Sequence, residues 1–183
     1  MSAASDLGGV CQSGAVARSF IAVRPPGHVR SAIVELQSTL GPGHRLVPPE
    51  QLHVTLRFWS DAPPAAIVTA LDGSTLPSTI ALVGPSVGEL GRDAVMLPVT
   101  GLDDLAAIVR TATAGVPPPV ARPFVGHLTV ARRKRGVSEG SVSGRPFAAS
   151  FPVRSIELVV SELRPTGAVH RRLRSWPVPT DAP

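Results

Sequence analysis

The sequence contains a single cysteine, Cys11, one lysine, Lys134, and no tyrosine among its 183 residues. One cysteine cannot form an intramolecular disulfide or a cysteine-based zinc site, and it fits a reducing compartment, so we expect a cytoplasmic protein. No run of about 18 apolar residues occurs, which argues against a membrane-spanning helix. Residues 1–17 lack the pattern of a secretory signal, and we expect a disordered tail followed by one folded domain over residues 18–183.

Aromatic and acidic residues are also scarce. Five Phe and two Trp are too few for a general platform that stacks single-stranded bases. The 18 Lys+Arg against 13 Asp+Glu give a net charge of +5. Basic residues concentrate at 132–135 and at Arg171, Arg172 and Arg174. These clusters indicate either a solvated basic surface or a partner that carries phosphate, whose binding would weaken as salt rises.

The remaining pattern predicts a mixed fold of helices and strands. Apolar residues at helical spacing predict helices over 28–40, 63–71 and 101–114. Segment 132–144 is polar and contains glycine, so it predicts an exposed loop. Because the helices are interspersed and do not alternate one for one with strands, the pattern predicts an α+β fold with mainly antiparallel sheet. Strands are predicted at 19–23, 44–47, 52–59, 79–83, 94–99, 123–131, 147–153, 156–163 and 169–176.

One short motif occurs twice, as His53-Val54-Thr55-Leu56 and as His127-Leu128-Thr129-Val130. Successive side chains of a strand point to opposite faces, so each histidine shares a face with its threonine while the apolar residues face a core. A single copy would be read as an incidental polar strand face. Two copies in a pseudo-symmetric fold could bring both His/Thr pairs to one cleft.

Paired imidazoles suit proton transfer on the two sides of one substrate. With a reference pKa near 6.5, one ring can be neutral and accept a proton while the other is protonated and donates one. Displacement at phosphorus needs this pair, and the hydroxyls of Thr55 and Thr129 can hold the non-bridging oxygens. The scheme requires no metal or other cofactor.

Other uses of the histidines fit the sequence less well. Neither motif has an adjacent carboxylate or a further His at the spacing of a metal site, and no Gly-x-Ser-x-Gly nucleophile is present. His28, His44 and His170 have no threonine two residues later, so we expect them to be surface or helix-end residues.

The two motifs resemble the two-histidine phosphoesterase superfamily, and within it the RNA 2',3'-cyclic phosphodiesterase (2'-5' RNA ligase-like) family. The resemblance covers nearly all of residues 18–178. Segments 46–58 and 122–132 are similar to the two family blocks, and 156–163 with Gly167, Leu173 and Trp176 is similar to the closing strands. It implies a bilobal fold in which two pseudo-symmetric lobes flank a central cleft.

The resemblance also implies an activity and roles. By family analogy, the enzyme is a phosphodiesterase that hydrolyses 2',3'-cyclic phosphate ends of RNA or nucleotides to 2'-phosphomonoesters. His53 would protonate the leaving ribose oxygen, His127 would activate water, and Thr55 and Thr129 would contact the phosphate. Neither a membrane nor an obligate protein partner is implied.

Three further residues are candidates for substrate contacts. Arg132 matches a family arginine that binds phosphate, but strict alternation puts it on the face opposite Thr129, so it would need a bulge to reach the cleft. Phe58 is similar to a position that can stack on a base. Strict alternation puts it on the face opposite His53, so packing in the core explains it at least as well. Strict alternation puts Arg57 on the same face as His53, so it is a candidate for a contact with a backbone phosphate.

The chain departs from the family pattern at two positions. Gly126 stands where relatives usually have a proline, and His170 stands where an aromatic residue is common. These departures bear on how the substrate fits. Two alternatives remain open from the sequence: 2'-5' ligation, which is the same chemistry in reverse, and a noncatalytic RNA-binding module, which would need arginines and aromatics more than paired imidazoles.

Overall fold

The computed structural model describes residues 18–116, 123–136, 142–164 and 167–180. The expected tail at residues 1–17 and residues 137–141 of the loop predicted over 132–144 lie outside the described residues. Within the described ranges the chain forms ten strands, three α-helices and one 3-10 turn. Their order and bounds are β1 Arg18–Val23, α1 Gly27–Ser38, β2 His44–Leu46, η1 Pro49–Gln51, β3 Val54–Trp59, α2 Pro64–Leu71, β4 Ile80–Val83, β5 Gly88–Leu90, β6 Ala94–Thr100, α3 Asp103–Ala112, β7 His127–Arg133, β8 Ala149–Pro152, β9 Ser155–Arg164 and β10 Gly167–Pro177.

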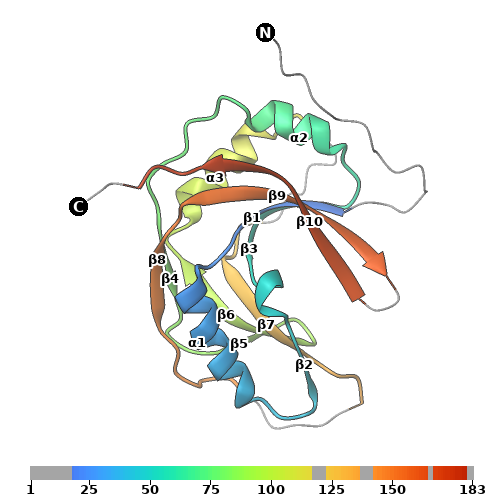
Figure 1. Ribbon diagram of the computed structural model, residues 1–183, viewed down its shortest axis with the longest axis vertical. Helices are drawn as coiled ribbons and strands as arrows, with labels where there is room; N and C mark the ends of the chain where they lie inside the picture. Colours follow the sequence, from blue (N-terminus) through green and yellow to red (C-terminus); the bar gives the residue numbers. More distant parts are fainter. Residues whose placement is uncertain (1–17, 117–122, 137–141, 165–166, 181–183) are drawn as a thin grey trace.

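All the strands belong to one curled antiparallel sheet with two halves. Its order is β10-β9-β1-β3-β7-β6-β4-β8, with β2 paired to β7 and β5 paired to β6. The first half holds β10, β9, β1 and β3, and the second holds the rest (Figure 1). The halves meet where β3 lies beside β7, at the pair Val54 and Leu128. This confirms the expected α+β fold with two lobes.

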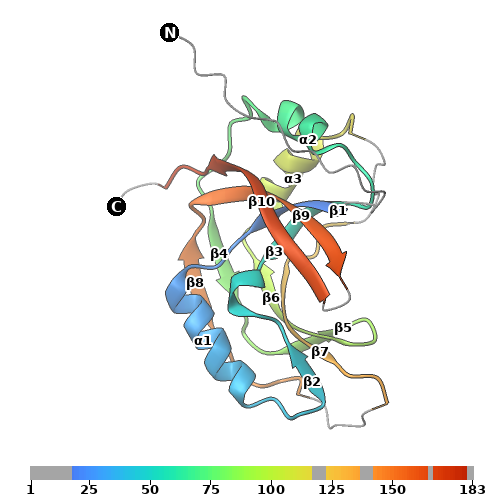
Figure 2. The same ribbon diagram turned by 45° about the vertical axis from the view of Figure 1, so that its right-hand side comes forward.

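The helices pack on one face of the sheet, where they build the main core. α1 buries Val29 and Ile33, and α3 buries Leu105 and Val109, all in one cluster with Val54, Leu128 and other inward residues of the strands. Both views place α2 and α3 together at one end of the molecule and α1 beside β8 at the other (Figures 1 and 2). We call the opposite face of the sheet the site face, because it carries both histidines of the repeated motif.

A small second cluster lies on the site face of the first half. Phe20, Ala22 and Val159 are buried there, separate from the main core. They come from β1 and β9, which pair directly at Phe20 and Val159. This patch gives the site face an apolar floor beside the first motif.

Most predicted elements occur within a few residues of their expected bounds, and three differ. The strand predicted over 52–59 begins at Val54, after the 3-10 turn Pro49–Gln51. β5 was not predicted, because three residues with a glycine carry almost no strand signal. β7 continues to Arg133, so the first two residues of the predicted loop 132–144 are strand. In the described residues, no helix is long and apolar enough to cross a membrane.

Candidate active site

The two motifs lie side by side across the junction of the halves. Val54 and Leu128 are register partners in antiparallel strands, and both side chains are fully buried. Extended by one residue in each direction, this register places His53 opposite Thr129 and Thr55 opposite His127, on the other face. Opposite side chains in such a pair have Cβ atoms about 5 Å apart, and diagonal ones about 7–8 Å. The two imidazoles are the diagonal pair, and His127 is close enough to lower the pKa of His53.

Both imidazoles are held in the same tautomer. Nδ1 of His53 lies 2.6 Å from the carbonyl oxygen of Gln51, and Nδ1 of His127 lies 2.8 Å from that of Val125. A carbonyl oxygen can only accept, so each Nδ1 carries the hydrogen and each neutral ring presents the lone pair of Nε2. In both cases the acceptor is two residues before the histidine. The pseudo-symmetry therefore extends to the hydrogen bond that orients each ring.

The two rings differ in their surroundings. Phe20 stacks on His53 with ring centroids 4.7 Å apart, and His170 stands edge-on to it at 5.4 Å. Burial lowers the pKa of His53 from 6.5 to about 4; the hydrogen bond to Gln51 opposes this, and His170, Arg24 and His127 lower it further. His53 is thus neutral at pH 7 in the free protein.

A cationic cluster lies next to His53. Arg24 donates to the Glu157 carboxylate at 2.7 Å and also to the carbonyl of Glu50, and Arg172 reaches the other oxygen of Glu157 at 3.2 Å. Burial lowers the pKa of His170 too, with a further contribution from Arg24. Arg24 therefore disfavours further positive charge on the rings of His53 and His170.

Two β-bulges change the side of the sheet on which the candidate substrate-contact residues lie. On β3, Thr55 pairs with Ala22 and Arg57 with Ile21, so Leu56 is an extra residue. Beyond that bulge, Phe58 pairs with Phe20, whose ring covers His53, and its side chain is 39% exposed. Phe58 therefore lies on the site face, and the argument that strict alternation places it on the opposite face no longer applies.

Arg57 lies on the other face, contrary to prediction. It pairs with the fully buried Ile21, its guanidinium carbon lies 5.1 Å from the centroid of the Trp59 ring, and it donates to the carbonyl of Arg110 at 2.6 Å. That carbonyl belongs to the last turn of α3. The contact ties β3 to the helix, and the bulge is the physical reason why the alternation failed.

The second motif has the equivalent bulge. On β7, Thr129 pairs with Met96 and Ala131 with Val95, so Val130 is the extra residue. Arg132 is thereby turned to the same face as Thr129, as its proposed role requires. Its guanidinium lies 3.2 Å from Asp93, and both side chains are about half exposed. In the pseudo-symmetric arrangement, Arg132 corresponds to Phe58.

Comparison with known proteins agrees with this geometry. No protein-family model matches the chain. An RNA 2',3'-cyclic phosphodiesterase of Thermus thermophilus is 31% identical over 178 residues, which cover 87% of this chain and 89% of that protein. The chain belongs to the RNA 2',3'-cyclic phosphodiesterase family. The assignment made from the two motifs, and with it the expectation of a phosphodiesterase enzyme, is confirmed.

Solved structures support the assignment at the level of the fold. A crystal structure of a Thermus thermophilus protein superposes with a TM-score of 0.74 at 28% identity, covering 90% of this chain and all of that one. E. coli LigT complexed with 3'-AMP gives 0.72 at 23% identity, over 88% and 97% of the two chains. The latter identity is low, so the likeness to LigT concerns the fold alone.

Two of the other histidines are not where the sequence placed them. His28 is exposed at the start of α1, as expected. His44 is 5% exposed in β2, and the half-buried His170 contacts both His53 and Phe20. The expectation was wrong for both because it used only local sequence. β10 reaches the site through its pairing with β9, and no local signal marks that neighbour.

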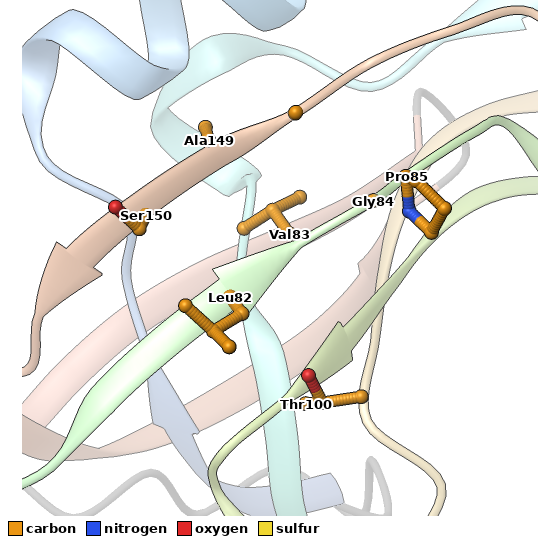
Figure 3. Close-up of a pocket in the computed structure, with 8 residues that line it drawn as sticks. Leu82, Val83, Gly84, Pro85, Thr100, Ala149 and Ser150 are labelled. Atoms are coloured by element: carbon orange, nitrogen blue, oxygen red, sulfur yellow. The ribbon is translucent and has the colours of Figure 1, made fainter.

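A separate surface hollow lies away from the two motifs. It has a volume of about 530 Å³ and lies between β4, β8 and the end of β6 (Figure 3). Apolar and small side chains line it, with the hydroxyls of Thr100 and Ser150 but no titratable group. It therefore cannot supply acid–base chemistry. Among the described residues, no three His, Cys, Asp or Glu side chains are grouped so that they could hold a metal ion.

Proposed function

We propose that this enzyme hydrolyses 2',3'-cyclic phosphates at the ends of RNA or on nucleotides to 2'-phosphomonoesters, with His53 and His127 as acid and base. The observation that carries the proposal is the pseudo-symmetric pair of Nε2-presenting imidazoles on neighbouring strands, each with a threonine beside it. Membership of the family supports the substrate class.

The phosphate would bind between the two rings. The hydroxyls of Thr55 and Thr129 have no partner among the described residues, so both are free to donate to the non-bridging oxygens. The two threonine hydroxyls oppose the negative charge that grows on the oxygens as water adds to phosphorus. Arg132 lies on the same face further along β7 and adds positive charge that favours a phosphate at the second motif.

Proton transfer then follows from the positions of the rings. Nε2 of His127 takes a proton from water as the water oxygen bonds to phosphorus. The bond from phosphorus to the 3' oxygen breaks, and that oxygen takes the proton of His53. The bond to the 2' oxygen remains, so the product is a 2'-phosphomonoester.

The acid role requires that His53 be protonated in the complex. Its pKa of about 4 in the free enzyme reflects burial and neighbouring positive charge. A phosphate anion placed against Nε2 reverses the sign of the local field and favours the charged ring. The substrate thus promotes protonation of the acid when it binds, and the resting enzyme carries no uncompensated buried charge on this ring.

The test is turnover of a nucleoside 2',3'-cyclic phosphate in excess chelator, with the product isomer identified by chromatography. We expect a 2'-phosphate, and a loss of roughly 10² to 10⁴ in kcat for His53→Ala and for His127→Ala. His28→Ala is the matched control, because His28 is exposed on α1. Full activity in either active-site variant, a 3'-phosphate product, or loss of turnover with chelator would each refute the scheme.

The compartment follows from composition. Because Cys11 has no second cysteine to pair with, we propose that the enzyme works in the reducing cytoplasm on RNA or nucleotides.

A further inference from the structure

Beyond the motifs, the site face of the second half continues into a ribbon of basic residues. Arg132 lies two strand steps past Thr129, about 7 Å along β7 once the bulge is allowed for. Arg45 of β2 is its direct register partner, so both guanidinium groups lie on the site face. Lys134 follows at the next alternate position and is exposed. We call Arg45, Arg132 and Lys134 the basic arm.

The basic arm has little local compensation. Asp93 lies beside Arg132 at 3.2 Å, and Lys134 donates at 2.6 Å to the neutral carbonyl of Pro42. The side chain of Arg45 is exposed and makes no hydrogen bond or ion pair in the described part of the chain. Like charges directly opposite in a sheet destabilise the pair. Arg132 therefore lies between Arg45 on β2 and Asp93 beside β6, so the two opposed arginines share one carboxylate partner, on the far side of β7 from Arg45, and their excess positive charge favours an anion.

The neighbouring arginine shows that this charge excess belongs to one face. Arg133 lies between Arg132 and Lys134 but points the other way, and its guanidinium pairs with Glu89 at 2.7 Å. It is the register partner of the buried His44. The core side of the ribbon is thus neutralised, while the site face keeps its excess of positive charge.

We propose that the basic arm binds the internal phosphates of an RNA strand whose cyclic end lies between His53 and His127, so that polynucleotides are preferred over mononucleotides. This inference rests on the proposed function. A phosphate beside Thr129 and another beside Arg132 are separated by about one extended nucleotide, and Lys134 lies a similar step further on. Arg45 and Arg132 can each make a forked contact with a phosphate.

The arm is open to a strand that arrives from outside. Both views show β2, the β5–β6 hairpin and the end of β7 grouped at the end of the molecule opposite α2 and α3 (Figures 1 and 2). α1 contacts β7 from the core side, where Gln37 donates to the carbonyl of Val130, and the side chains of Arg45, Arg132 and Lys134 are exposed. A chain of phosphates can therefore leave the site along β7 without crossing the core.

The experiment compares kcat/KM for a nucleoside 2',3'-cyclic phosphate and for a short single-stranded RNA with the same cyclic end, over a range of salt concentrations. We expect the RNA to be the better substrate, and its advantage over the mononucleotide to fall as salt rises. Arg45→Gln should reduce that advantage by roughly tenfold, the value of one charge-assisted contact. It should also make the slope against log salt shallower by about 0.7.

Arg154→Gln is the matched control, since it removes one positive charge from an exposed residue between β8 and β9. It should leave the advantage of RNA intact. Equal kcat/KM for the two substrates in the wild type, an unchanged ratio in Arg45→Gln, or the same loss in Arg154→Gln would overturn the inference. If neither substrate is hydrolysed, the proposed function fails, and fluorescence anisotropy with RNA ending in a 2'-phosphate then tests the arm separately.

Discussion

The pKa of His53 gives the sharpest quantitative expectation. Its ring stacks on Phe20, His170 stands edge-on to it, and Arg24 lies nearby. Burial by these neighbours, together with nearby positive charge, lowers the pKa of His53 from 6.5 to about 4. A general acid must carry a proton, so the bound phosphate has to raise this pKa substantially. Return to the ordinary value would be a shift of about 2.5 units, or about 3 kcal/mol of interaction between the ring and the anion.

The assay is an NMR titration of histidine-labelled enzyme, with the His53 signal assigned by its absence in His53→Gln. In the free enzyme we expect the ring to titrate near pH 4. With a saturating nucleoside 2'-monophosphate, the product of the proposed reaction, the midpoint should move up by about one unit or more, on the order of 1.4 kcal/mol. A free-enzyme midpoint at or above the ordinary value for histidine, or the same midpoint with and without product, would refute the reasoning.

Stability and substrate binding provide three more tests. Folding lowers the pKa of His53 from 6.5 to about 4, so the unfolded chain binds a proton on this residue more readily than the folded protein does. The free energy of unfolding should therefore be constant above about pH 6.5 as far as His53 is concerned, and should fall as the pH drops toward about 4. In urea unfolding, we expect the wild type to lose up to about 3 kcal/mol more than His53→Gln over that range. Gly126→Ala would put a Cβ 2.2 Å from the carbonyl oxygen of Val99, so we expect about 1–3 kcal/mol of destabilisation by urea unfolding, whereas Gly115→Ala, with open space around it, should change little. Phe58→Ala should raise KM for nucleotide substrates by about fivefold or more with little change in kcat, as expected for loss of a stacked base, and an unchanged KM would return Phe58 to a structural role.

Periodicity alone predicted the faces of the two motifs correctly. Val54 and Leu128 are buried partners, and the histidines and threonines beside them share the other face. The prediction succeeded because alternation holds over three or four residues of a strand. It needed no knowledge of the rest of the fold.

Alternation failed where a bulge intervened. Leu56 and Val130 each add one residue, and neither has a sequence signature, since both are ordinary apolar strand residues. Every assignment beyond them therefore changed face: Arg57 turned to α3, while Phe58 and Arg132 turned to the site. A bulge three residues after each histidine is itself part of the repeat, although only the pairing reveals it.

Neighbours from distant strands could not be predicted either. His170 reaches His53 because β10 pairs with β9, β9 with β1 and β1 with β3. Arg45 faces Arg132 because β2, far from β7 in sequence, joins its edge. Such contacts depend on strand order, which local propensity does not encode.

The central claim is that His53 and His127 act on one phosphorus atom from its two sides. A crystal structure with a vanadate adduct of a nucleoside, which imitates the five-coordinate phosphorus, tests it most directly. We predict Nε2 of each ring at about 3 Å from a different apical oxygen of the same vanadium. Vanadate bound to one ring only, or seated away from both, would contradict the account.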